Sequence, residues 1–167
     1  TVPAMGYSII ERRTKLKPEF KNIPQDELMR IRKQGTEITY ELRVPIIAYL
    51  GDTIPGPHLE RDEICNAKIV ISECTFFEQT HKERAAVGKH FHVDDFAKLL
   101  PQLNAEAVIL THISRRTNLG VARRELIDRV GEEQADRIHI LMDHRENKKR
   151  YDAQLAETLL EAEVEAD

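Results

Sequence analysis

The sequence predicts an α/β fold in which a mixed, largely parallel sheet is flanked by helices. Three short apolar runs, each long enough for one strand, alternate with segments of helical periodicity. An ionisable residue closes each run: Asp52 after IIAYL (46–50) and Gly51, Glu73 after KIVIS (68–72), and His112 after AVILT (107–111). Ligands collect at the carboxyl ends of parallel strands. We therefore expect Asp52, Glu73 and His112 to share one rim of the sheet.

The remaining elements follow from the same patterns. Periodicity predicts three further strands, over residues 6–12, 36–42 and 137–144, the last ending in Asp143 and His144. It predicts four helices, over residues 24–35, 93–100, 118–131 and 153–166. Gly35 and Gly131 are the expected stops of two of these helices, and Pro101 should end or kink a third.

Composition limits the class of protein. A chain of 167 residues that is 41% hydrophobic is expected to form a single domain around one core. It has no apolar run near the ~20 residues that span a bilayer, and no signal-peptide layout at its start. We expect a soluble, cytoplasmic protein with no membrane partner. Cys65 and Cys74 lack CxxC spacing and are expected to be reduced and structural.

The net charge of −4 is unevenly distributed. Residues 1–43 carry nine Lys and Arg against six Asp and Glu, whereas residues 151–167 carry six acids and no base. Runs of this kind are usually solvated surface, so 151–167 is interpreted as an acidic helical tail. The positive surplus can also face an anionic substrate, but it is far below that of a dedicated nucleic-acid-binding domain.

Each candidate residue has an ordinary structural explanation when it is taken alone. Asp52 precedes a Pro/Gly-rich turn and is typical of a turn former, and His112 is equally well a hydrogen-bonded histidine at a strand end. Their predicted convergence on one rim favours a functional site over these ordinary explanations. Two carboxylates and an imidazole on one edge are the ligands of a hard or borderline metal ion, not of a thiolate site.

Four motifs carry a family resemblance. They are YLGDT (49–53), ISECTFFE (71–78), GKHFHVDDFA (88–97) and VILTHISRR (108–116). Their order and spacing resemble the metallo-β-lactamase-fold hydrolases, and most of all the ribonuclease Z branch, whose pieces read approximately GDT, HEATF, GHST and LTHxSxRY. The opening VPAMGYSIIE is similar to the passage after the third metal-binding histidine of that branch. The resemblance covers residues 2–117 and implies the second half of an αββα sandwich, with residues 1–167 as the C-terminal half of one domain.

The resemblance also implies roles for four residues. Asp52 corresponds to the carboxylate that bridges two metal ions, and His112 to a terminal imidazole ligand. His90 corresponds to the histidine that stabilises charge on the phosphate in the transition state, and Glu73 to the carboxylate that orients it. A carboxylate fixes the tautomer of an imidazole and raises its basicity, so this pairing is physically sensible.

Several positions depart from the ribonuclease Z pattern. Ser72 stands in place of a histidine, Lys89 in place of a glycine and Thr117 in place of a tyrosine. His92 is expected to face solvent or to cap the helix that follows it. His58 and His81 match no motif and are expected at the surface.

The HxHxDH motif of the fold and its third metal-binding histidine are absent from the sequence. Two ligand side chains do not complete even one zinc site, which needs about four ligands. We therefore expect a missing N-terminal half that carries HxHxDH, supplied by the same gene or by another chain. A degenerate, non-catalytic association module is the alternative from a different class. The resemblance further implies a homodimer.

The activity implied by the resemblance is hydrolysis of a phosphodiester at a dinuclear centre. Two zinc ions per complete site, or Mn²⁺ in their place, would turn a bridging water into the attacking hydroxide, with the aspartate of HxHxDH as general base. A small ester or phosphodiester substrate with no RNA role is the alternative. The isolated chain is expected to be inactive.

The substrate expectation depends on an arm. In the ribonuclease Z branch, a long arm between the third histidine and GDT grips the body of the tRNA. After its predicted strands, the corresponding interval here leaves little beyond residues 12–35, which is short for a two-helix arm. Most affinity for nucleic acid comes from neutralised phosphates. The complete protein is therefore expected to cleave a small activated phosphodiester but to cut precursor tRNA poorly, unless another subunit contributes a grip.

Overall fold

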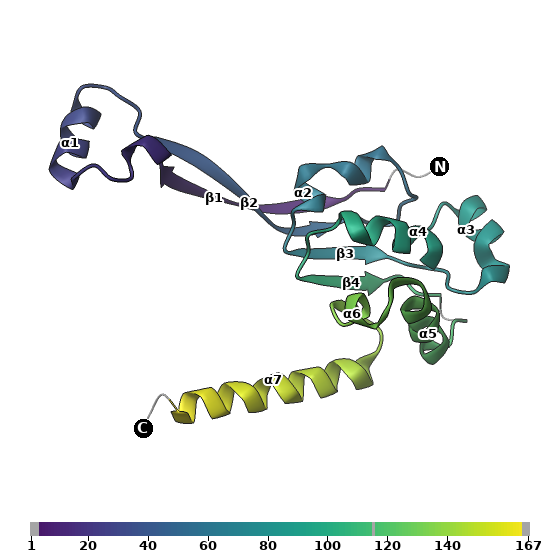
Figure 1. Cartoon of the computed structure of the whole chain (residues 1–167). Helices are drawn as coiled ribbons and strands as arrows, with labels where there is room; N and C mark the ends of the chain where they lie inside the picture. Colours follow the sequence, from purple (N-terminus) through teal and green to yellow (C-terminus); the bar gives the residue numbers. More distant parts are fainter. Residues whose placement is uncertain (1–3, 115, 165–167) are drawn as a thin grey trace.

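A computed structural model describes residues 4–114 and 116–164 of the chain (Figure 1). Within these residues, one five-stranded sheet has the order β1-β2-β3-β4-β5. Its strands are β1 (Tyr7–Leu16), β2 (Thr39–Tyr49), β3 (Ile69–Glu73), β4 (Ala107–Thr111) and β5 (Ile138–Ile140). β1 is antiparallel to β2, and the other neighbouring strands are parallel. The predicted mixed, largely parallel sheet is confirmed.

Helices connect the strands. The α-helices are α1 (Gln25–Lys33), α2 (Asp62–Cys65), α3 (Lys82–Gly88), α4 (Val93–Leu99), α5 (Leu119–Val130), α6 (Glu132–Ala135) and α7 (His144–Val164). Short 3-10 turns lie at η1 (Pro18–Phe20), η2 (Pro57–Glu60), η3 (Gln79–His81) and η4 (Leu100–Gln102). The helices predicted over 24–35, 93–100 and 118–131 are confirmed as α1, α4 and α5. Among the described helices, none is both long enough and apolar enough to cross a membrane.

The last helix begins earlier than its sequence pattern indicates. The strand predicted over 137–144 ends at Ile140, and α7 starts at His144 instead of residue 153. The Asp143 carboxylate accepts a hydrogen bond from the backbone N–H of Glu146 at 3.1 Å, and the Asn147 side chain donates to the carbonyl of Ile140 at 3.1 Å. These bonds tie the helix start to the strand end. The predicted helix end at 166 lies outside the described residues.

The helices that pack on the sheet form one layer. The strand order advances in one direction from β2 to β5, and right-handed crossovers along such an order place every connecting helix on the same face. The core reflects this arrangement, because Val70, Val108 and Leu110 of the sheet are buried in one cluster with Phe96 of α4 and Leu126 of α5. One helical layer on one sheet is half of the four-layer sandwich that the sequence implies.

The opposite face of the sheet is left open by the described helices over β2, β3 and β4. At β5, Arg150 of α7 lies 2.6 Å from Nδ1 of His139, which alternates with the buried Ile138 and Ile140. Side chains alternate along each strand, so the neighbours of the buried Val70 and Val108 point to this second face. There Ile71 and Ile109 are half-buried, and Tyr49, which pairs with Ile71 across β2 and β3, is 40% exposed. The sheet therefore presents an apolar surface beside the ends of its strands.

The first two strands form an arm. β1 pairs with β2 over its whole length, whereas β3 pairs only with residues 47–49 of β2. The rest of the hairpin projects from the body as a two-stranded ribbon with η1 and α1 at its tip (Figure 1). The interval is too short for a two-helix arm, as expected, because the tip holds one α-helix and a 3-10 turn. The further expectation that the arm is lost is wrong, because the ribbon itself projects from the body.

The arm was missed because β2 is longer than the sequence pattern suggests. The strands predicted over 36–42 and 46–50 are one strand that runs through Pro45. Proline cannot donate a hydrogen bond within a sheet and is expected to interrupt a strand. Here the pairing with β1 shifts register: Ile9 lies opposite Ile47 and Ile10 opposite Pro45, so Ile46 is an extra residue in β2. This irregularity accommodates the missing donor, and pairing resumes beyond it.

Asp94 links helices α3, α4 and α5 through ion pairs. Its carboxylate accepts hydrogen bonds from Arg129 of α5 and from Lys82 of α3, while Asp94 itself lies in the first turn of α4. Partial burial by itself raises the pKa of Asp94, but the bonds from Arg129 and Lys82 outweigh it and hold the pKa well below its usual range. The resulting stabilisation is fully present above the unfolded pKa of about 4 and is lost as the pH falls toward the folded pKa.

Replacing Asp94 by Asn is expected to lower the free energy of unfolding at pH 7 by about 2 kcal/mol, because Arg129 and Lys82 both lose a charged partner and Arg129 keeps only Glu125. The difference from wild type should shrink as the pH falls from about 4 to 2. Urea unfolding of the purified protein at several pH values measures both effects. Asp95→Asn is the matched control: it removes a pair with Lys98, whose side chain is 74% exposed, and should change stability by less than about 0.5 kcal/mol. Equal losses for the two variants would contradict the assignment.

Candidate metal and catalytic site

Asp52 is presented by a turn directly after β2. Gly51 has a φ of 67°, a left-handed conformation that glycine adopts without strain. A Cβ at this position would lie 2.5 Å from the carbonyl oxygen of Met5. Glycine therefore lets the N-terminal segment pack against the turn, and the chain reverses sharply enough to direct Asp52 to the rim of the sheet.

His112 follows β4 at the same rim. Its φ is 57°, which is uncommon outside glycine, although histidine is among the residues that tolerate it better. Such strain persists only where the surroundings fix the conformation, and it concentrates at functional sites. The conformation turns the His112 side chain away from the strand direction and toward Asp52.

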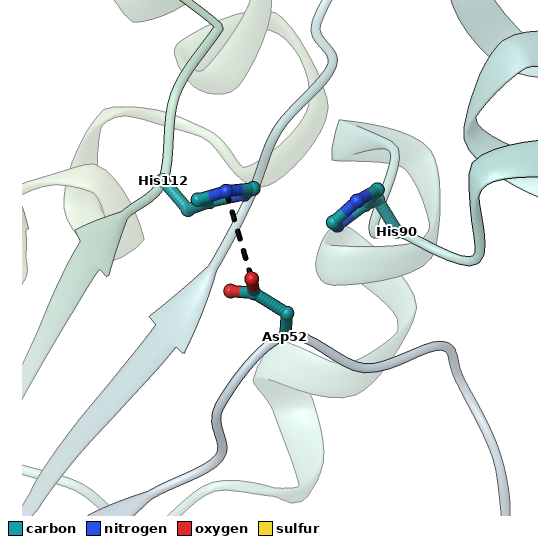
Figure 2. A group of neighbouring side chains, drawn as sticks. All are labelled: Asp52, His90 and His112. Atoms are coloured by element: carbon teal, nitrogen blue, oxygen red, sulfur yellow. Dashed lines mark ion pairs between the residues drawn. The ribbon is translucent and has the colours of Figure 1, made fainter. Parts of the chain in front are cut away.

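Three side chains converge at the strand ends (Figure 2). One ligand atom from each of Asp52, His90 and His112 lies within 4.8 Å of the others. Nε2 of His112 is 3.6 Å from Oδ2 of Asp52, and the rings of His90 and His112 are stacked with centroids 5.0 Å apart. The structure therefore brings together three of the four residues that the sequence singles out.

Glu73, the fourth, lies behind the two rings as a buried carboxylate. It is 1% exposed and ends β3. Its Oε1 accepts from Nδ1 of His90 and from the backbone N–H of Phe91, both at 3.0 Å. Its Oε2 accepts from the backbone N–H of Thr75 at 3.1 Å and from the Thr75 hydroxyl at 2.6 Å. Four donors thus satisfy the carboxylate, which is what allows it to be buried.

Thr75 was not singled out from the sequence. Its hydroxyl oxygen lies 2.9 Å from Nδ1 of His112, in addition to its bond to Glu73. The only sequence signal is its position two residues after Glu73, where a hydroxyl can return to the preceding carboxylate. Its contact with His112 joins residues far apart in the chain and has no local signature.

The other histidines and Asp143 lie outside this cluster of three. His92 is fully buried, which excludes the solvent-facing alternative, and its Nδ1 caps α4 by accepting from the backbone N–H of Asp94. Its Nε2 lies 3.1 Å from the carbonyl oxygen of Glu78, so both ring nitrogens are occupied. His58 is exposed, as expected, and contacts the Thr53 hydroxyl.

Ser72, His81 and the two cysteines also lie outside this cluster. Ser72 is buried, and its hydroxyl donates to the carbonyl of Glu73 at 2.9 Å. His81 is half-buried and packs edge-on against Phe76, so it does not lie freely at the surface. Cys65 and Cys74 are both free, and burial raises the pKa of the Cys74 thiol well above its usual range. These thiols fit the structural role expected from the sequence.

An open cleft of about 730 Å³ adjoins the cluster. The residues that line it include Tyr49, Asp52, Thr53, Lys89 and His90. Asp52 and His90 are therefore accessible from solvent, whereas Glu73 and Thr75 hold the rings from the buried side.

The donor set fits a borderline cation such as zinc. The hydrogen bond at Nδ1 of His112 leaves its Nε2 free on the side of Asp52, and one carboxylate with one or two imidazoles is a common zinc ligand set. The sequence assigned His90 to catalysis alone, but the geometry also places it within reach of the same ion. Three protein ligands still fall short of two complete zinc sites.

Similar proteins define one class, the ribonuclease Z hydrolases. No family model matches the chain. Its homologues among curated proteins are tRNase Z and ribonuclease Z proteins, as the motifs implied. The chain spans less than half the length of these relatives.

Two curated relatives and two solved structures illustrate the extent of this similarity. tRNase Z TRZ2, chloroplastic, from Arabidopsis thaliana is 29% identical over 129 residues, covering 75% of this chain and 36% of that protein. Ribonuclease Z from Saccharolobus islandicus is 32% identical over 145 residues, covering 74% and 48%. Among solved structures, a long form RNase Z from yeast shares 29% identity with a TM-score of 0.38, covering 47% of this chain and 10% of that one. The metallo-beta-lactamase fold protein YhfI from Bacillus subtilis shares 15% identity with a TM-score of 0.46, covering 78% and 45%.

Lys89 shows why glycine is the usual residue before His90. It ends α3 in a left-handed conformation, with φ 60° and ψ 45°. Lys89→Gly is expected to raise the free energy of unfolding by about 0.5–1 kcal/mol, because glycine adopts this conformation without Cβ strain. Urea unfolding at pH 7 tests this. Lys89→Ala keeps the Cβ and should give no gain, and a gain for both variants would indicate a charge effect instead.

Proposed function

We propose that this chain is the C-terminal part of a ribonuclease Z-like, metal-dependent phosphodiesterase. The observation that carries the proposal is the convergence of Asp52, His90 and His112 at the strand ends, in front of a buried Glu73 that fixes the His90 ring. The homologues named ribonuclease Z support the same class. A sheet with this edge can hold a metal ion through Asp52 and His112 and place the His90 imidazole beside a phosphate group.

Each residue would have a distinct part in the reaction. Asp52 and His112 would hold the metal, which we infer to be zinc, in up to two copies. Bound zinc supplies Lewis acidity, which activates water and neutralises charge on the phosphate. His90, held through Nδ1 by Glu73, presents its other nitrogen to the cleft, where it can stabilise charge on the phosphate and give a proton to the departing oxygen.

A complementary half completes the site in this proposal. The described residues supply at most three ligands, and the apolar sheet face that includes Tyr49, Ile71 and Ile109 lies beside the same rim. Large apolar surfaces of this kind mark interaction sites. A second layered unit that carries HxHxDH, from the same gene or another chain, would cover this face and add the missing ligands. Homodimerisation of the complete protein remains a prediction.

The two metal-site roles can be separated by mutation in the complete protein. Asp52→Ala should abolish both metal binding and turnover, because it removes the shared carboxylate. His90→Ala should keep the metal and lower kcat by about 10²–10³-fold, the effect typical of losing one transition-state donor. Elemental analysis after dialysis, together with hydrolysis of bis-p-nitrophenyl phosphate, provides both readouts.

His144→Ala is the control, because this histidine is exposed at the start of α7, away from the cluster. It should leave metal content and turnover unchanged. Loss of metal from the His90→Ala protein would make His90 a ligand and would refute its role as a proton donor. A complete protein that binds no metal and hydrolyses no phosphodiester would support the non-catalytic association module.

The arm favours an RNA substrate. The expectation of poor activity on precursor tRNA depended on a missing arm, and the ribbon of β1 and β2 removes that basis (Figure 1). α1 at its tip has Arg30, Arg32 and Lys33 in its last turn. Cations on a projecting element can contact phosphates far from the chemical step. We therefore infer that the complete protein binds a structured RNA, with precursor tRNA as the first candidate.

Replacing Arg30, Arg32 and Lys33 together by Gln is expected to raise KM for precursor tRNA about tenfold at physiological salt and to flatten its salt dependence. Hydrolysis of bis-p-nitrophenyl phosphate should change less than twofold, because the tip is remote from the metal residues. Steady-state kinetics at several salt concentrations measures these effects. Asp26→Asn with Glu27→Gln, on the same helix, should lower KM for the RNA. Equal behaviour of the acidic and basic variants would refute binding through the tip.

A further inference from the structure

Thr75 joins the buried carboxylate to the second imidazole. Its hydroxyl oxygen is 2.6 Å from Oε2 of Glu73 and 2.9 Å from Nδ1 of His112, and the residue is 6% exposed. We propose that Thr75 is a positioning residue that fixes the tautomer and ring orientation of His112 for metal binding. This inference rests on the proposed function, in which His112 is a metal ligand.

The direction of the hydrogen bonds follows from the number of protons. A threonine hydroxyl has one hydrogen, and an ionised carboxylate can only accept, so the hydrogen of Thr75 points to Glu73. The lone pairs of the same oxygen then face His112, whose Nδ1 must carry the proton. The Nε2 of His112 is left as the free acceptor, and this is the atom that lies 3.6 Å from the carboxylate of Asp52.

One carboxylate therefore orients both rings. Glu73 reaches His90 directly through Oε1 and reaches His112 through Oε2 and the Thr75 hydroxyl. The two histidines come from different places, the loop before α4 and the end of β4. A threonine side chain supplies the reach that Glu73 lacks toward the neighbouring strand.

The backbone holds Thr75 in register with both partners. Its N–H donates to Glu73 at 3.1 Å, and its carbonyl accepts from the N–H of Ser114 at 3.2 Å. The N–H of the preceding Cys74 donates to the carbonyl of Thr111, the residue before His112, at 3.1 Å. These backbone hydrogen bonds hold Thr75 against the loops after β3 and β4. They therefore position its hydroxyl without the help of a metal ion.

The test compares Thr75→Val with Thr75→Ser in the complete protein. Valine keeps the shape but removes the hydroxyl, so zinc affinity, measured by competition with a chelator, should fall about 10–100-fold. Serine keeps the hydroxyl and should stay within about threefold of wild type. Ser72→Ala removes a neighbouring buried hydroxyl that contacts neither ring, and it should leave zinc affinity unchanged.

A second readout is independent of activity. In the metal-free protein, ¹⁵N NMR of the histidine rings should show His112 as the Nδ1–H tautomer, with the signal assigned by its absence from His112→Asn. Thr75→Val should populate the Nε2–H form. An Nε2–H tautomer in the wild type would overturn the proposal even if Thr75→Val failed to fold, and equal zinc affinity for the valine and serine variants would also overturn it. A protein with the Nδ1–H form that neither binds zinc nor hydrolyses phosphodiesters would refute the proposed function instead.

Discussion

The buried carboxylate of Glu73 is the constraint on which the site depends. A carboxylate that is 1% exposed would be destabilised by several kcal/mol if its oxygens lacked partners. Two backbone N–H groups, a hydroxyl and an imidazole supply those partners. The hydrogen bonds to this single charge fix the positions of the loop after β3, the backbone of Phe91 and the ring of His90. Stability and site geometry therefore have the same cause.

The sheet then decides what can reach this carboxylate. β3 lies between β2 and β4, so Glu73 at its end has the Asp52 turn on one side and His112 on the other. Both neighbours leave their strands through a left-handed residue, Gly51 or His112 itself. These sharp exits direct the side chains across the strand ends. The side of the cluster that lines the cleft is open to solvent, and the side that hydrogen-bonds to Glu73 and Thr75 is packed against the core.

The same topology is consistent with the proposal that the chain carries only part of a site. Crossovers along β2 to β5 place the helices on one face, and the other face keeps half-buried apolar side chains next to the cluster. The cluster of Asp52, His90 and His112 lies where this open face meets the strand ends, so the complementary unit proposed above would also reach the cluster. The arm leaves the sheet elsewhere, so in the proposed function it would separate binding of an extended substrate from the chemical step.

Local sequence determined much of this protein. Strand-length apolar runs predicted the parallel strands, and the ionisable residues after them placed Asp52, Glu73 and His112 on one rim. Capping and stop residues predicted α1, α4 and α5 closely. These features depend on neighbours in the chain, and short-range periodicity carries that information.

Tertiary structure decided the rest. Two separate strands were predicted over 36–42 and 46–50, but β2 continues through Pro45 with a register shift against β1 and forms the arm. His92 was left between a solvent-facing and a capping role, and burial decided for the cap. Thr75 gave no signal of its contact with His112, and the reach of His90 toward Asp52 was not foreseen. In each case the deciding partner lies on another segment, and only the folded chain brings the two within hydrogen-bonding or ligand distance.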